Sequence, residues 1–409
     1  MISLGPQALS AIARRPATAR EILTVVTPEH PPAQGQSSGA DAREPRPDAS
    51  AAGPAALPGP GVGTDIGAEW SRAVKALGGA AEICLACHVR PDGDALGSML
   101  AVAHALRARG SQERAPSSPP ARIVASFGDQ PFEIPRILRF LPGAGLLSPP
   151  DAFPERPQVM VTFDAARADR LGTLEASARA ADELIVLDHH ASNAGFGTVN
   201  LVDPAAAATA VVAADLIDRM GVELTRDIAM GLYAGLVTDT GSFKYPTTSP
   251  RVHELAARLL RTGIEPGSVA RELWDRSPFG FLGLLSAVLG RARLEPAGAA
   301  GHGLVWTTVT RSDRAVHGLP FDAAESVIDV VRRTDEADVA IVLKEDDEGR
   351  WQVSARSKGA ANVGRACVAL GGGGHSLAAG FTAHGTAAEV MSALRLQLAA
   401  GPAAAVRGP

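Results

Sequence analysis

The sequence predicts an α/β protein with two domains: a parallel sheet with flanking helices, followed by a helical linker and a smaller α/β domain. Two apolar runs, Val159 to Phe163 and Leu184 to Leu187, are typical of strands buried in a parallel sheet. Segments with helical periodicity alternate with such runs, and this alternation favours a parallel sheet. A second set of strand and helix patterns begins near Leu294.

Changes in composition indicate the domain limits. Residues 1–67 are rich in Ala, Pro, Gly and Ser, and we expect them to be disordered because they bury too little apolar surface to offset the entropy of ordering. The tail, 401–409, is expected to be disordered as well. Between these ends we place the first domain at 68–265, the helical linker at 266–293 and the second domain at 294–400.

The charge and composition exclude some classes of partner. With 39 Lys and Arg against 44 Asp and Glu, the net charge of -5 argues against a basic surface for long nucleic acid. Aromatic residues make up only 4% of the chain, which argues against a stacking platform for long single strands. Any nucleic-acid substrate is therefore expected to be short, and the lack of an 18-residue apolar run predicts no membrane span.

The three cysteines are too few, and odd in number, for a disulfide framework, so we expect a reducing, cytoplasmic environment. Cys84 and Cys87 have the spacing of a zinc or redox pair, but residues three apart on a strand point to opposite faces. We interpret them as buried packing thiols.

In the first domain, a helix is predicted from about Ala68 to Leu77, then a strand over residues 81–89 that ends in a Pro-Asp-Gly turn. This turn carries three candidate metal ligands, His88, Asp92 and Asp94, just before a helix from Ala95 to Arg109. The alternative is that Asp94 only caps the helix while the other two are solvated.

The next strand is predicted over residues 121–128, with a short helix over 135–143. Each of the two apolar runs ends in polar residues: Asp164 follows the first, and Asp188, His189 and His190 follow the second. An acid after a strand is often only a turn former, and a histidine pair there is also typical of an ordinary polar loop. Helices are expected over 205–221 and 225–238, and Asp239 just beyond them is expected to be held by the hydroxyls of Thr238 and Thr240.

The carboxyl ends of parallel strands meet at one edge of a sheet, so these side chains are expected to converge. The candidate ligands comprise four carboxylates and two imidazoles: His88, Asp92, Asp94, Asp164, His189 and Asp239. This set has too many acids for one zinc ion and too few oxygens for calcium, and it suits two manganese or magnesium ions bridged by a carboxylate. Paired metals are typical of enzymes that act at phosphorus.

The second domain is predicted to hold a strand over 303–310, a helix over 323–334, a hairpin of 337–345 with 350–359, and a C-terminal helix to about Ala399. The four glycines from Gly371 to Gly374 precede His375 and a helix predicted to start at Ser376. Their exposed N–H groups would cradle a phosphate, although a flexible linker is the alternative interpretation.

Four segments, HVRPDGDALGS, TFDAA, VLDHHASN and YAGLVTDTGSF, resemble in order and spacing the motifs of the DHH phosphoesterase superfamily. The resemblance implies one ion on His88, Asp92 and Asp164, and a second on Asp94, Asp164, His189 and Asp239. It also implies catalytic roles for Asp164, for Asp188 as a support, and for His190 in contact with the phosphate or leaving group.

The segments SARSKG and GGGGHSLAAG resemble the substrate-binding domain that accompanies the DHH domain in nanoRNases, and the similarity extends over about residues 68–400. It implies that the substrate is held by Arg356, Ser357, Gly372, Gly373, Gly374 and His375. It further implies a cytoplasmic homodimer with two Mn²⁺, for which Mg²⁺ or Co²⁺ would substitute.

The implied reaction is hydrolysis of short oligoribonucleotides to 5′-mononucleotides and of 3′-phosphoadenosine-5′-phosphate to AMP. The alternative is a phosphodiesterase for cyclic di-AMP or linear dinucleotides. A single-strand DNA exonuclease would need further domains, and a manganese pyrophosphatase would carry a basic signature in place of GGGGH. A non-catalytic nucleotide sensor is disfavoured because no ligand is missing from the set.

Overall fold

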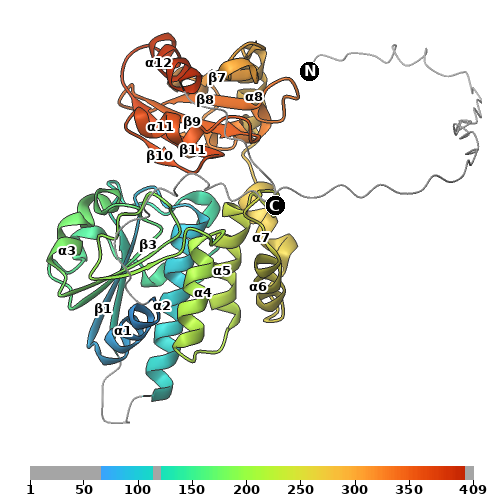
Figure 1. Cartoon of the computed structure of the whole chain (residues 1–409). Helices are drawn as coiled ribbons and strands as arrows, with labels where there is room; N and C mark the ends of the chain where they lie inside the picture. The colour runs from blue at the N-terminus through green and yellow to red at the C-terminus, as the bar shows by residue number, and fades with distance from the viewer. Residues whose placement is uncertain (1–65, 114–120, 401–409) are drawn as a thin grey trace, which may run out of the picture. The chain divides into compact units, whose positions relative to one another are not determined.

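The computed structural model describes residues 66–113 and 121–400, without the side chains of 111–113 (Figure 1). The disorder expected for residues 1–65 and 401–409 lies outside the described residues. Helix α1 (Ile66–Gly79) begins two residues before the predicted domain limit. No described helix is both long and apolar enough to cross a membrane.

The first sheet is parallel and has the order β2-β1-β3-β4-β5. Its strands are β1 (Glu82–Cys87), β2 (Arg122–Phe127), β3 (Val159–Phe163), β4 (Glu183–Asp188) and β5 (Val199–Val202). Strand β1 lies between β2 and β3, so the order in which strands are added to the sheet reverses direction at β1. Ligands bind at such a switch point in open parallel sheets, beyond the carboxyl ends of the strands.

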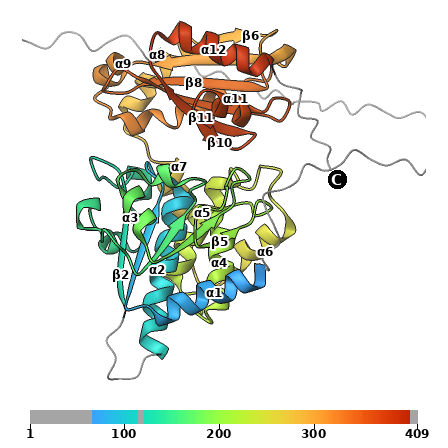
Figure 2. The same cartoon turned by 60° about the vertical axis from the view of Figure 1, so that its left-hand side comes forward.

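Helices cover both faces of this sheet. One face packs on α1, α2 (Gly93–Glu113) and α4 (Thr209–Arg219), and the other on η4 (Ala168–Leu174) and α3 (Glu175–Ala180). Helix α5 (Arg226–Asp239) packs on α2 and α4, and α6 (Pro250–Leu260) packs on α5. Helix α1 packs against β5 and α4 (Figure 2). Cys84 and Cys87 are buried free thiols in opposite cores, which confirms the packing interpretation.

Helices α2 and α5 pack unusually closely because glycines face each other where they cross. A Cβ added at Gly97 would overlap the carbonyl oxygen of Gly231, and the reverse holds for Gly231. One turn further along α5, a Cβ at Gly235 would lie 2.6 Å from Asp94 Oδ1. The small residues therefore bring the first turn of α2 against the last turns of α5.

The second domain is built on a six-stranded sheet of order β10-β11-β9-β8-β7-β6. Only the pair β7 and β8 is parallel. The strands are β6 (Arg293–Glu295), β7 (Leu304–Val309), β8 (Val339–Glu345), β9 (Trp351–Ser357), β10 (Gly373–Gly374) and β11 (Ala378–Ala383). The predicted hairpin is confirmed as β8 and β9.

Separate apolar cores line the two faces of this sheet. Helices α11 (Val363–Ala369) and α12 (Ala387–Ala399) contribute to one core, and α8 (Gly280–Gly290) and α10 (Val327–Val331) to the other. The remaining helical segments are α7 (Pro266–Trp274), α9 (Arg311–Val316), η1 (Arg136–Leu138), η2 (Ala144–Leu146), η3 (Pro150–Ala152), η5 (Ala299–Gly301) and η6 (Phe321–Ala324).

Several predicted helices were wrong in extent. Helix α2 continues past Arg109, the segment at 135–143 forms only the turn η1 between two prolines, and the segment at 323–334 is split into η6 and α10. Helix α4 begins at Thr209 rather than at residue 205, because Ala208 is extended and a carboxylate from α2 binds the first N–H groups of the helix.

The helix predicted to start at Ser376 was also wrong. The chain folds back there as an antiparallel pair of β10 with β11, and the His375 N–H donates to the Ala378 carbonyl at 2.8 Å. The glycine run therefore belongs to a hairpin and has no helix N-terminus behind it.

The close approach of α2 and α5 can be tested with Gly97→Ala. We expect this change to lower the free energy of unfolding by about 1–3 kcal/mol, because the new methyl group overlaps the backbone of α5. Gly110→Ala is the matched control: it lies in the same helix, nothing is within 4 Å of the added Cβ, and alanine favours helix by up to about 1 kcal/mol. Urea unfolding followed by circular dichroism measures both, and equal effects would contradict the glycine-contact interpretation.

Candidate active site

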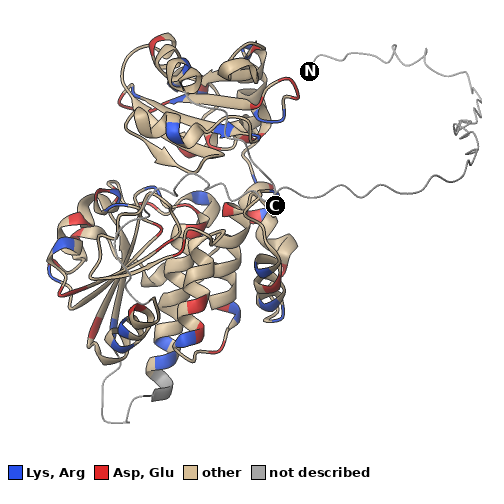
Figure 3. Cartoon of the chain, viewed as in Figure 1, with Lys and Arg blue, Asp and Glu red and all other residues tan. Residues whose placement is uncertain are grey.

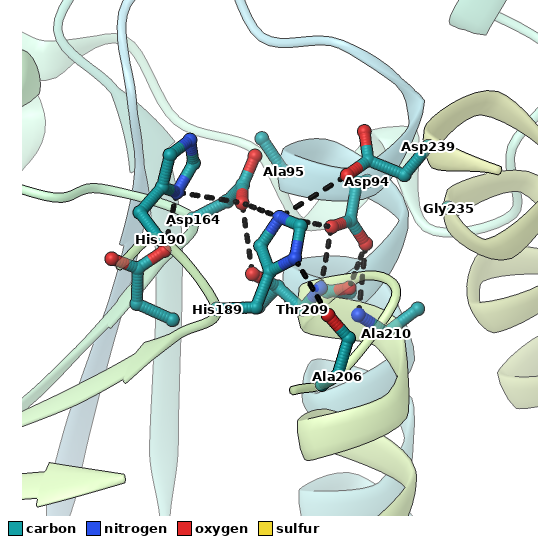
Figure 4. A network of polar contacts seen from close by, with 12 residues as sticks. Asp94, Ala95, Asp164, His189, His190, Ala206, Thr209, Ala210, Gly235 and Asp239 are labelled. Carbon is teal, nitrogen blue, oxygen red and sulfur yellow. Dashed lines mark hydrogen bonds and ion pairs between the residues drawn. The ribbon is translucent and has the colours of Figure 1, made fainter. Parts of the chain in front are cut away.

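The structure brings all six predicted metal ligands together at the carboxyl edge of the first sheet. Figure 4 shows four of them, Asp94, Asp164, His189 and Asp239. His88 follows β1, Asp164 follows β3 and His189 follows β4. Asp94 lies in the first turn of α2, and Asp239 is the last residue of α5 rather than lying beyond it. Potential ligand atoms of His88, Asp92 and Asp164 lie within 4.8 Å of one another, as do those of Asp94, Asp164 and His189.

Asp164 lies at the centre and is common to both groups. Its Oδ2 is 3.5 Å from His88 Nε2, and its Oδ1 is 3.5 Å from His189 Nε2. Its backbone is left-handed, with φ of 58°, a conformation that aspartate tolerates better than most residues. Burial alone would raise the pKa of Asp164, but the surrounding histidines outweigh this and hold the pKa well below its usual range. The carboxylate is therefore charged and oriented for bridging two cations.

Asp94 is fully buried and held by the N-terminus of α4. The backbone N–H groups of Thr209 and Ala210 donate to its two oxygens at 2.6 and 2.8 Å, and the Ser98 hydroxyl donates at 3.1 Å. The positive end of the α4 dipole stabilises this negative charge. Burial nevertheless raises the pKa of Asp94, and the like charges of Asp164 and Asp239 raise it further. The crowded carboxylates thus need more positive charge than one helix end supplies.

Two histidines present a free ring nitrogen to these carboxylates. Nδ1 of His88 lies 2.8 Å from the Val89 carbonyl, and Nδ1 of His189 lies 3.1 Å from the Ala206 carbonyl. Since a carbonyl only accepts, Nδ1 is the donor in each ring, and Nε2 is the nitrogen that faces the carboxylates. His189 Nε2 is buried and makes no hydrogen bond, although it lies 3.1 Å from Asp239 Oδ2. An orphaned, inward-facing nitrogen among carboxylates fits a metal ion.

The pKa values of this pair reflect the same charge imbalance. Burial alone would lower the pKa of His189, but Asp239, Asp164 and Asp94 outweigh it and raise the pKa to about 11. Burial raises the pKa of Asp239 to about 6, even though His189 opposes the rise. In the metal-free protein, a proton on His189 therefore supplies positive charge that a bound cation would supply instead.

Asp92 is the most exposed of the six predicted metal ligands, and its carboxylate also caps a helix. Its Oδ1 accepts the N–H groups of Asp94 and Ala95, both at 3.0 Å, and so caps α2. The capping role considered for Asp94 therefore belongs to Asp92. Its side chain remains 53% exposed, which leaves it able to bind a cation as well.

The prediction that the hydroxyls of Thr238 and Thr240 hold Asp239 was wrong. The Thr238 hydroxyl donates to the carbonyls of Ala234 and Gly235, and the Thr240 hydroxyl donates to that of Leu236. A threonine near the end of a helix bonds readily to the carbonyl one turn back, so these hydroxyls are taken up by α5 itself.

His190 is oriented by Asp188, whose Oδ1 lies 2.7 Å from His190 Nδ1. The other oxygen of Asp188 accepts from Asn193 Nδ2 at 2.6 Å, and that amide also reaches the carbonyl of Ala165. Asn193 was not predicted, although it ends the VLDHHASN segment. It ties the loop after β4 to the loop that carries Asp164.

Thr209 was also missed. Its hydroxyl donates to Asp164 Oδ1 at 2.8 Å, while its N–H holds Asp94, so one residue fixes two predicted ligands. The only sequence signal was a single polar residue within an alanine-rich run.

Among the predicted substrate-binding residues, His375 lies at the site. Its ring stacks on that of His190 with centroids 4.6 Å apart, and its Nε2 is 3.8 Å from Asp239 Oδ2. Burial lowers the pKa of His375 to about 4, with the like charges of His190 and His189 acting in the same direction.

The other predicted substrate-binding residues are placed differently. Ser357 is buried, donates to Asp338 Oδ2 at 2.8 Å and accepts from the Gly359 N–H, so its hydroxyl is already engaged. Arg356 donates to the carbonyl of Ala355. Gly372 and Gly374 pack too closely on β11 to carry a Cβ, whereas Gly373 has open space around it. Their substrate contacts stay a prediction.

The support from Thr209 gives a test. Thr209→Val keeps the N–H that holds Asp94 but removes the hydroxyl that orients Asp164, so we expect metal affinity to fall by about 10- to 100-fold. Thr209→Ser, which keeps the hydroxyl, should stay close to the unchanged protein. Calorimetric titration with Mn²⁺ measures the difference, and full affinity in the valine variant would show that the hydroxyl does not matter.

Comparison with known proteins identifies the family of both domains. A family model described as the DHH family, N-terminal domain, matches residues 82–236, and a DHHA1 domain model matches residues 314–399. A bifunctional oligoribonuclease and PAP phosphatase NrnA from Thermus thermophilus is 33% identical over 74% of this chain and 84% of the relative. The Bacillus subtilis protein of that name is 25% identical over 73% of this chain and 88% of the relative.

Among solved structures, an exopolyphosphatase-related protein from Bacteroides fragilis superposes with a TM-score of 0.70 at 23% sequence identity. The match covers 81% of this chain and 96% of that one, and it supports the fold. With both domain models matched and a relative aligned along most of its length, the chain belongs to the DHH family of phosphoesterases, in the form that carries a DHHA1 domain.

Proposed function

We propose that this protein hydrolyses short oligoribonucleotides to 5′-mononucleotides and 3′-phosphoadenosine-5′-phosphate to AMP, using two divalent cations. The observation that carries the proposal is the convergence of three further carboxylates and two imidazole Nε2 atoms around Asp164. The names of the NrnA relatives supply the substrate classes.

His88, Asp92 and Asp164 would hold one cation, and Asp94, Asp164, His189 and Asp239 the other. Mixed oxygen and imidazole ligands suit Mn²⁺, with Mg²⁺ or Co²⁺ as substitutes. When bound, two such ions activate water and stabilise charge that develops at phosphorus. The carboxylate crowding makes a metal-free site electrostatically unfavourable, as the shifted pKa values of Asp94 and His189 indicate.

The remaining residues would position the substrate. His190 is fixed through Nδ1 by Asp188, which leaves Nε2 for the phosphate or the leaving group. His375 lies beside it and, because its pKa is lowered to about 4, is neutral near pH 7 and able to accept or donate a hydrogen bond. Arg356 would supply a charge-assisted contact to phosphate.

The overall charge supports a short substrate. Blue and red segments are interspersed along the helices in Figure 3, and the net charge is -5. This balance of charges does not favour the binding of a long polyanion. The cytoplasmic homodimer that the resemblance implies is part of the same proposal.

Cyclic di-AMP or linear dinucleotide hydrolysis is the alternative, and a substrate panel decides between them. Short RNAs, 3′-phosphoadenosine-5′-phosphate and cyclic di-AMP should be compared with Mn²⁺ and with chelator. Turnover of cyclic di-AMP alone would replace the proposal by the alternative, and no turnover of any of them would defeat both.

Asp164→Asn tests the two-metal arrangement. Asparagine tolerates the left-handed backbone but lacks the bridging charge, so we expect kcat/KM to fall at least about a thousandfold on every substrate while the fold is kept. Asp169→Asn, an exposed acid on η4, should change little. Near-normal turnover of the Asp164 variant in Mn²⁺ would rule out a bridging role.

His375→Ala and Arg356→Ala test the positioning role of the second domain. Each should lower kcat/KM for nucleotide substrates by about ten- to a hundredfold, the value of one charge-assisted contact, with metal content unchanged. Bis-p-nitrophenyl phosphate, which needs less positioning, should suffer less, and His384→Ala at an exposed site serves as the control. Equal losses on both kinds of substrate would contradict a positioning role.

A further inference from the structure

Two arginines that the proposed function does not use border the ligand cluster. Arg90 lies between His88 and Asp92, and Arg170 follows Asp164 on η4. The Val89 N–H donates to the Arg170 carbonyl at 2.9 Å, so the two loops run side by side. We call Arg90 and Arg170 the arginine pair.

The backbone at Arg90 is strained. Its φ is +54°, a left-handed conformation that glycine or asparagine adopts far more readily than arginine. The Arg90 N–H donates to Asp129 Oδ2 at 2.6 Å, which fixes this conformation. Strain of this kind, held in place by a neighbouring loop, is typical of a residue kept for its side chain.

Both guanidinium groups lack an acidic partner. Among the described residues, no carboxylate forms an ion pair with Arg90 or Arg170, although both residues keep contact with solvent. Arg90 donates to Gln352 Oε1, a neutral acceptor. By contrast, Arg167, which immediately precedes η4, pairs with Asp169 at 2.7 Å.

The two guanidinium groups of the arginine pair also repel each other. Desolvation lowers the pKa of Arg170, and the like charge of Arg90 lowers it further. Adjacent guanidinium groups that lack a close ion pair are arranged to receive an anion, because each offers a planar fork of donors that matches phosphate. The two arginines lie at the more exposed end of the ligand cluster, near Asp92, whose side chain is 53% exposed. Asp94, by contrast, is fully buried.

We propose that the arginine pair binds a second, terminal phosphate monoester of the substrate, in addition to the phosphate that is cleaved. This inference rests on the proposed function, whose substrates carry such a group: 3′-phosphoadenosine-5′-phosphate has two phosphates, and a 5′-phosphorylated dinucleotide has one besides the scissile ester. The competing explanation is that the pair only offsets the charge of Asp92 and Asp164, which both act on Arg170.

The variants Arg90→Gln, Arg170→Gln and the double change test this, with Arg167→Gln as the matched control. For pApA, each single change should lower kcat/KM by about ten- to a hundredfold. For ApA, which lacks the terminal phosphate, the change should stay within about threefold, with Mn²⁺ content unaltered. Equal losses on the two substrates, or loss of metal, would overturn the subsite in favour of charge compensation.

Binding separates this inference from the proposed function. Calorimetry with Ca²⁺ in place of Mn²⁺ compares 3′-phosphoadenosine-5′-phosphate with 5′-AMP. The unchanged protein should prefer the bisphosphate by about tenfold or more, and the double variant should bind both alike. A protein that cleaves no short RNA but shows this preference would defeat the proposed function and support the subsite, whereas an equal preference in both proteins would overturn the subsite.

Discussion

The site depends on placing several carboxylates, two of them almost fully buried, within a few ångströms of one another. A cluster of neighbouring buried carboxylates is energetically unfavourable unless nearby positive charge compensates it. The fold supplies part of that charge through the N-terminus of α4, which holds Asp94, and through the imidazoles around Asp164. The raised pKa of His189 shows how strongly the surrounding carboxylates favour positive charge at this point.

The packing of the first domain follows from the same requirement. Asp94 and Asp239 come from different helices, and their carboxylates can share a site only because glycines let α2 and α5 approach closely. Thr209 then joins the N-terminus of α4 to the loop after β3 through Asp164. A core of small residues is therefore part of the chemistry, because larger ones would move the ligands apart.

Local patterns were sufficient to predict most strands of the first sheet and the polar residues at their ends. Strand β3 has the predicted limits, and the residues after β1, β3 and β4 converge as expected for parallel strands. What local patterns could not reveal were contacts made across the chain: Thr209 lies 115 residues from Asp94, and nothing near it in the sequence indicates a partner. Thr238 and Thr240 were misassigned for the opposite reason, since their hydroxyls bond within their own helix. Strand β5, four residues long, was too short to stand out.

The left-handed backbone at Asp164 has an evolutionary consequence. Among charged residues, aspartate is the one that accepts this conformation easily, so glutamate would fail on backbone grounds as well as on length. Asparagine accepts it too, and its codons differ from those of aspartate by a single base. A single base change at Asp164 would therefore keep the backbone conformation while removing the central negative charge of the cluster, which is a short route from a charged site to a neutral one.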